Sequence, residues 1–85
     1  MTKTITVRYF ASIREAMGTG EETWATTAPT VAAMRLALAG RSAQAALVLA
    51  ENQPVRLALN QAMCPPDAPI APGDEVAFFP PVTGG

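Results

Sequence analysis

Two segments with apolar residues at every second position, one near each end of the chain, most constrain how it can fold. Residues 4–10 form the first segment and residues 75–79 form the second. Such alternation, rich in β-branched and aromatic residues, predicts strands with one buried face. The inward-facing sets are Ile5, Val7 and Tyr9 in the first segment, and Val76 and Phe78 in the second. Because 85 residues make only one small domain, we expect both strands in the same sheet.

Further strands are expected between these two. Residues 21–27 predict a second strand, although Trp24 is their only bulky residue. Its short connection to the first strand favours an antiparallel pair. Residues 55–59 alternate again and predict a third strand, with an inward set of Val55, Leu57 and Leu59. The pair Asn60–Gln61 predicts a turn, and residues 62–64 a short return strand.

The main helix is expected to follow Thr30, whose side chain can cap it. Three apolar residues then recur at i, i+3 and i+7, which places them on one helical face: Val31, Met34 and Leu38. Gly40 is expected to end or kink this helix. Ser42 can cap a second helical stretch. This stretch is expected to end at residues 52–54, which include Pro54.

A shorter helix is expected directly after the first strand. Ser12 is positioned to cap it, and Glu15 three residues later would complete a capping box. The helix would run through Met17 and break at Gly18.

The order of these elements predicts the fold class. A sheet with one face to cover and one main helix between its strands indicates an α+β domain of the β-grasp, ubiquitin-like kind. We expect a mixed sheet of four to five strands, with the first and last strands as parallel neighbours at its centre. Residues 1–79 would form this domain, and residues 80–85 a flexible, extended C-terminal tail.

Composition and charge exclude several functions. The net charge is −1 and the isoelectric point about 5.1, so no basic surface for nucleic acid or anionic lipid is expected. The chain has no histidine and one cysteine, which leaves too few ligands for a zinc site and no imidazole base. The start of the chain lacks the apolar core of a signal peptide, and the longest apolar run is residues 45–50. We therefore expect a cytoplasmic domain with no metal and no bound cofactor.

The alternation also predicts an apolar patch on the uncovered face of the sheet. Phe10 and Phe79 point away from the core in their strands, and Met63 could join them from the short strand. Exposed apolar patches mark partner-binding sites. A bulge at a strand end, which would turn one of these side chains inward, is the alternative.

The six residues after the last strand indicate a terminus that other proteins bind and modify. Fully extended, they span roughly 20 Å. Pro80 and Pro81 restrict the backbone, so less entropy is lost when a partner orders the tail. Val82 and Thr83 provide side chains to grip, whereas Gly84 and Gly85 let the backbone pass a narrow channel. A merely frayed end is the alternative for a terminal Gly-Gly alone.

The same residues carry a resemblance to a known family. Residues 74–85, Asp-Glu-Val-Ala-Phe-Phe-Pro-Pro-Val-Thr-Gly-Gly, resemble the C-terminus of the small subunits of molybdopterin synthase, the MoaD family of ubiquitin-like sulfur carriers. Residues 7–11, 13–15 and 59–61 resemble that family as well. The likeness extends over nearly the whole chain and is weak between Arg41 and Gln53.

The resemblance implies a mechanism. A MoeB-like, ATP-dependent activating enzyme would adenylate the Gly85 carboxylate, and a sulfurtransferase would supply the sulfur that replaces AMP. The resulting thiocarboxylate, carried on a tail of Pro80, Pro81, Val82, Thr83 and Gly84, would enter the MoaE-like large subunit of a heterotetramer. There it would convert cyclic pyranopterin monophosphate into the dithiolene of molybdopterin. AMP and the thiocarboxylate would be transient covalent states on a subunit that is no enzyme on its own. The family's contact patch would correspond to Phe10, Met63 and Phe79.

Two other functions stay open from the sequence. The chain could carry sulfur for thiamin thiazole or tRNA thiolation, or it could be a β-grasp interaction module without covalent chemistry. Cys64 is expected to be a small apolar residue rather than a sulfur donor. Four carboxylates stand in adjacent pairs, face opposite ways along a strand and are expected to be solvated: Glu21, Glu22, Asp74 and Glu75.

Overall fold

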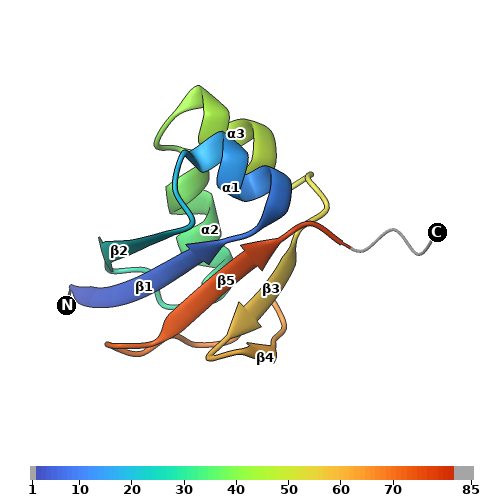
Figure 1. Ribbon diagram of the computed structural model, residues 1–85. Helices are drawn as coiled ribbons and strands as arrows, with labels where there is room; N and C mark the ends of the chain where they lie inside the picture. Colours follow the sequence, from blue (N-terminus) through green and yellow to red (C-terminus); the bar gives the residue numbers. More distant parts are fainter. Residues whose placement is uncertain (1, 82–85) are drawn as a thin grey trace.

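The computed structural model describes residues 2–81, which form one mixed five-stranded sheet with three helices on one of its faces (Figure 1). The elements in chain order are β1 (Lys3–Tyr9), α1 (Ala11–Met17), β2 (Glu21–Thr26), α2 (Val31–Ala39), α3 (Ala43–Leu49), β3 (Arg56–Leu59), β4 (Ala62–Met63) and β5 (Glu75–Phe79). The strand order across the sheet is β2-β1-β5-β3-β4. The predicted α+β class and β-grasp topology are confirmed.

The centre of the sheet is the parallel pair of β1 and β5, which run side by side in Figure 1. Val7 lies opposite Val76, and Tyr9 lies opposite Phe78. Strands β1 and β2 pair antiparallel, as their short connection predicted. The last strand therefore lies in the middle of the sheet, where β1 and β3 hold it on both sides.

The core lies between the sheet and α2. All five predicted inward residues of β1 and β5 are fully buried or nearly so, as are the three apolar residues of α2: Ile5, Val7, Tyr9, Val76, Phe78, Val31, Met34 and Leu38. The Thr30 hydroxyl accepts a hydrogen bond from the Ala33 N–H at 3.2 Å and caps α2. The Ser42 hydroxyl caps α3 in the same way, at 3.0 Å from the Ala45 nitrogen.

The expected capping of α1 is wrong. The helix already begins at Ala11, so Ser12 lies inside its first turn, and no side chain caps this end. Phe10 is the N-cap residue and keeps the extended backbone of β1. Ala11 then takes a positive φ of 52°, which turns the chain from strand to helix within one residue. The capping box of Ser12 and Glu15 is therefore not formed, whereas Gly18 ends the helix at a φ of 78°, as expected.

Some strand boundaries differ from prediction by one residue. β1 ends at Tyr9 rather than Phe10, β2 ends at Thr26, β3 begins at Arg56, and β4 ends at Met63. Within β3 the simple alternation fails, because Leu57 and Ala58 are both buried. They face opposite sides of the sheet, so Ala58 is covered by neighbouring side chains on the face that lacks helices.

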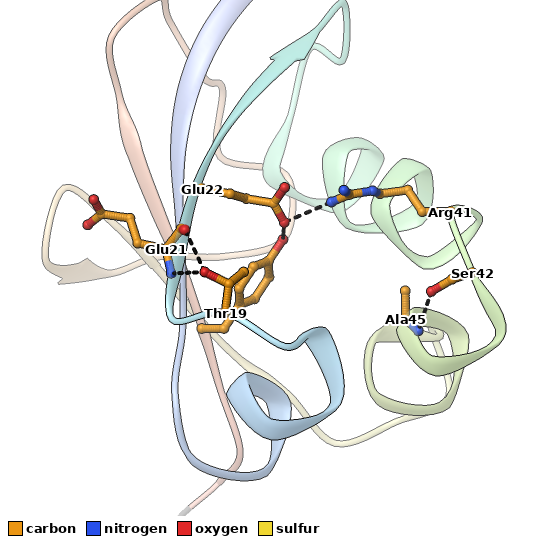
Figure 2. A network of polar contacts seen from close by, with 7 residues as sticks. Thr19, Glu21, Glu22, Arg41, Ser42 and Ala45 are labelled. Carbon is orange, nitrogen blue, oxygen red and sulfur yellow. Dashed lines mark hydrogen bonds and ion pairs between the residues drawn. The ribbon is translucent and has the colours of Figure 1, made fainter.

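A polar network joins β1 and β2 to Arg41, which lies two residues after the end of α2 (Figure 2). The Tyr9 hydroxyl donates a 2.6 Å hydrogen bond to a Glu22 carboxylate oxygen, which also accepts one at 2.8 Å from Arg41. Burial opposes the ionisation of Glu22, but the hydrogen bonds from Arg41 and Tyr9 outweigh it and lower the pKa of this carboxyl. Burial and the same carboxylate raise the pKa of the Tyr9 phenol. The expectation of a solvated Glu22 is therefore wrong, whereas Glu21 is exposed.

A second polar anchor holds α3 against α2. Arg35 donates three hydrogen bonds of 2.7–2.8 Å to the carbonyl oxygens of Leu49, Ala50 and Gln53. Two of these carbonyls lie at the C-terminal end of α3, where helical partners are missing. Arg35 and the buried side chains of Ala45 and Leu49 thus hold α3 in place. In the part of the chain that the structure describes, no helix has the length and apolarity to cross a membrane.

Candidate partner surface and tail root

The face of the sheet opposite the helices carries the predicted apolar patch, which consists of Phe10, Met63 and Phe79. The rings of Phe10 and Phe79 lie 6.3 Å apart between centroids and nearly perpendicular, an edge-to-face contact. Phe10 is 40% exposed and Met63 59% exposed. The alternative in which a bulge turns one of these side chains inward is wrong for Phe10 and Met63, and Phe79 is half-buried against Phe10.

Local backbone geometry fixes Phe10 in this position. Its N–H donates to the Phe78 carbonyl at 3.2 Å, which extends the pairing of β1 with β5 by one residue. The left-handed conformation of Ala11 follows immediately and costs on the order of 1–2 kcal/mol for a residue with a Cβ. The chain thus turns away to α1 only after Phe10 has been placed beside the end of β5.

Small residues form the floor beside this patch. Ala77 on β5 lies opposite Ala58 on β3, which lies opposite Met63 on β4. Both alanines are buried, although no helix covers them. Together with the apolar patch, Arg8, Gln61 and Glu75, they line a depression on the open face. A floor of methyl groups with aromatic walls is a surface that accepts an apolar side chain from a partner.

The tail begins at the edge of this surface. Pro80 and Pro81 follow β5 and are half-buried. Pro81 lines a depression with Met63 and Cys64 on one side, and both prolines line another with Leu47 of α3 on the other side. The predictions for Val82, Thr83, Gly84 and Gly85 lie outside the described residues. What the structure provides is the root of the tail, next to the apolar patch.

Comparison with known proteins decides the family. The model of the ThiS family matches residues 7–85. The chain belongs to the ThiS family. It is 47% identical to the molybdopterin synthase sulfur carrier subunit of Escherichia coli over 81 residues, which cover 95% of this chain and 99% of that protein. It is 38% identical to the subunit of the same name from Haemophilus influenzae, with the same coverage.

Solved structures of related proteins show the same fold as this ThiS-family chain. The Haloferax volcanii HVO 2177 protein superposes with a TM-score of 0.83 at 29% identity, covering 99% of this chain and 88% of its own. A second match is to a complex of subunits 1 and 2 of the molybdopterin-converting factor from Helicobacter pylori. Its TM-score is 0.62 at 26% identity, with 96% of this chain and 99% of that one covered.

Arg8 lies beside the patch of this ThiS-family chain, although it is not among the site residues predicted from the sequence. Its guanidinium carbon lies 5.4 Å from the centre of the Phe10 ring, and its Nε lies 3.6 Å from a Glu21 oxygen. The first distance allows a cation–π contact, whereas the second is too long for a hydrogen bond. The aromatic wall of the patch therefore carries a cation at its rim.

The surroundings of Cys64 make its thiol unreactive. It follows β4, is half-buried, and packs against the core. Burial raises the pKa of its thiol, which keeps it protonated and weakly nucleophilic. This environment agrees with the interpretation of Cys64 as a small apolar residue rather than a sulfur donor.

Proposed function

We propose that this chain works as the sulfur carrier subunit of a molybdopterin synthase, with the terminal Gly85 as the sulfur-bearing residue. The observation that carries the proposal is the apolar patch beside the root of the tail, in a chain 47% identical along 95% of its length to a protein of that name. A carrier needs a surface by which a partner recognises it and a terminus that the partner can reach. Here the apolar patch and the root of the tail lie at the same end of β5.

The proposed chemistry takes place at the terminal carboxylate. A carboxylate oxygen of Gly85 attacks the α-phosphorus of ATP, pyrophosphate leaves, and an acyl-adenylate forms. A sulfur nucleophile then attacks the acyl carbon and AMP departs with the bonding electron pair. With a persulfide as the nucleophile, the product is an acyl disulfide; a thiol then attacks its donor-side sulfur, forms a disulfide with the donor and leaves the other sulfur on Gly85 as a thiocarboxylate. Held in a partner's active site, this group reacts at the high effective concentration of a tethered nucleophile.

The partners follow from this chemistry. The apolar patch would bind the large subunit of the synthase, as subunit 1 binds subunit 2 in the Helicobacter pylori complex. An ATP-dependent activating enzyme and a sulfurtransferase would load the tail, in the cytoplasm where ATP is available. The chain itself would catalyse none of these steps, because it contributes the reacting group and its partners contribute the catalytic side chains.

Intact-mass measurement tests the carrier chemistry. The full chain is incubated with an activating enzyme, MgATP and a sulfur donor, and the mass of the chain is compared before and after. Exchange of one oxygen for sulfur, located at Gly85 by fragmentation, is the expected result. If the mass never changes although the enzyme adenylates a known carrier in parallel, a non-covalent interaction module is the better description.

Binding assays separate the possible pathways. The loaded chain is offered to a molybdopterin synthase large subunit and, in parallel, to a thiazole synthase. We expect stable binding and sulfur transfer with the large subunit only. Binding to the thiazole synthase alone would transfer the function to thiamin synthesis and overturn this proposal.

A further inference from the structure

Two arginines frame the apolar patch on the open face. Arg56 of β3 lies directly opposite Phe79 of β5, and Arg8 of β1 lies opposite Ala77. Residues paired across neighbouring strands point to the same side of a sheet. Both guanidinium groups therefore stand on the face that carries Phe79 and Met63, one on each side of β5.

The two arginines differ in what already surrounds them. Arg8 has the Phe10 ring beside it and Glu21 nearby, so its charge is partly balanced. Arg56 is exposed, and within residues 2–81 its side chain takes part in no ion pair and no hydrogen bond. Arg56 also lines the depression that Met63 and Pro81 share at the root of the tail. An unbalanced positive charge thus lies at the tail side of the apolar patch.

A partner that covers the patch must also cover this charge. The Arg56 guanidinium carries a positive charge, and docking removes water from it. A buried charge without a partner is costly, whereas a carboxylate can satisfy the guanidinium with two parallel hydrogen bonds. A binding partner without an acceptor at this point would lose affinity.

We propose that Arg56 determines which partner can dock, and that the partner presents a carboxylate to it at the edge of the apolar contact. Arg8 makes a weaker contact of the same kind on the opposite side of the patch. This proposal rests on the proposed function, which supplies the partner: the large subunit of the synthase. The docking surface is therefore an apolar centre with the unpaired charge of Arg56 at its tail side and Glu75 beside Arg8 on the other side. Its complement is an apolar centre with a carboxylate that faces Arg56.

A phosphate group is a less suitable occupant. The phosphate of an adenylate would be attached to Gly85, four residues beyond Pro81. In a tail extended into a partner, four residues span up to about 14 Å, which moves the phosphate away from the tail root. Arg56 is placed beside Phe79 and Pro81, so it faces the partner's surface and not the reacting end.

The test measures the affinity of the full chain for the large subunit from the same organism, at low and at high salt. We expect Arg56→Gln to weaken binding about 3- to 10-fold and Arg56→Glu about 30-fold or more, while Arg8→Gln weakens it about 2-fold. Salt should weaken binding of the unchanged chain more than binding of the Arg56→Gln variant. Only the unchanged chain has the charge pair with the partner that salt can screen.

Gln44→Glu is the control, because it adds a negative charge on α3, among the helices on the other side of the sheet, and should leave the affinity unchanged. Thermal unfolding of each variant shows that it is folded. If Phe79→Arg abolishes binding but both Arg56 variants bind like the unchanged chain, this proposal is wrong and the proposed function stands. If the unchanged chain does not bind the large subunit at all, both proposals are wrong.

Discussion

The rings of Phe10 and Phe79 meet edge to face, with their centroids 6.3 Å apart, across the junction of β1 and β5. Neither residue belongs to the buried core, yet each holds the other in one orientation. This contact joins the end of the first strand to the end of the last, where the tail begins. A partner that approaches the tail root therefore meets a preformed aromatic surface, which reduces the entropy lost on binding.

Replacing Phe79 by arginine should weaken binding of the large subunit by a factor of about 30 or more, because aromatic residues at the centre of an interface are typical hot spots. The variant should remain folded, since Phe79 lies on the open face. Affinity is measured by calorimetry, and folding by circular dichroism. Leu36→Arg provides the matched control, because Leu36 is 52% exposed on α2 and lies on the helix side. Equal losses in both variants would argue against a specific patch.

Removal of Gly85 should abolish sulfur loading without changing the stability of the domain. The chemistry is proposed at that carboxylate, whereas all the residues of the core cluster lie between Ile5 and Phe78. Intact mass after incubation with the loading enzymes measures the first effect, and urea denaturation measures the second. A truncated chain that still gains sulfur would place the reacting group elsewhere, with Cys64 as the next residue to test.

The Tyr9–Glu22–Arg41 network predicts how stability depends on pH. The pKa of Glu22 is lower in the folded chain, so its ionised form stabilises the fold above about pH 4.5, and this contribution is lost as the pH falls through the folded value. The pKa of Tyr9 is raised, so its contribution is complete below about pH 10 and is lost as the pH rises. Stability measured by urea denaturation should fall on both sides of neutrality.

Two variants test which residue causes the loss of stability at acid pH (the acid limb) and which causes the loss at alkaline pH (the alkaline limb). Glu22→Gln should flatten the acid limb, and Tyr9→Phe should flatten the alkaline limb while it removes about 1–2 kcal/mol at neutral pH through the lost hydrogen bond to a carboxylate. Glu21→Gln is the neighbouring control, since Glu21 is exposed and its carboxylate accepts no hydrogen bond from residues 2–81. An acid limb that persists unchanged in Glu22→Gln would assign it to other carboxylates.

Much of the fold and part of the site follow from one-dimensional patterns. Alternation separates Val76 and Phe78 from Phe79 by the geometry of a strand alone, and the cap at Thr30 depends only on its own helix. The proximity of Phe10 and Phe79 follows if the first and last strands are neighbours in the sheet. These features are predictable because each depends on local geometry and one topological assumption.

The features that the sequence does not predict depend on how strands and helices are placed against one another, or on unusual backbone angles. Alternation gives the face of Arg56 but does not say that it lies opposite Phe79, and it cannot show that Glu22 lies within reach of Arg41. The burial of Ala58 has the same origin, because its cover comes from side chains on neighbouring strands. The start of α1 at Ala11 was missed because a positive φ in an alanine has no sequence signal.

Arg35→Met should destabilise the domain more than an exposed arginine substitution does. Methionine keeps most of the apolar stem but removes three hydrogen bonds, which leaves the carbonyls of Leu49, Ala50 and Gln53 without this donor. The expected loss is about 2–3 kcal/mol, or a fall in Tm on the order of 10 °C for a domain of this size. Arg14→Met, at an exposed position of α1, should change stability by less than about 0.5 kcal/mol. If the two variants unfold at the same temperature, α3 is held by its apolar contacts alone, and the three carbonyls find water instead.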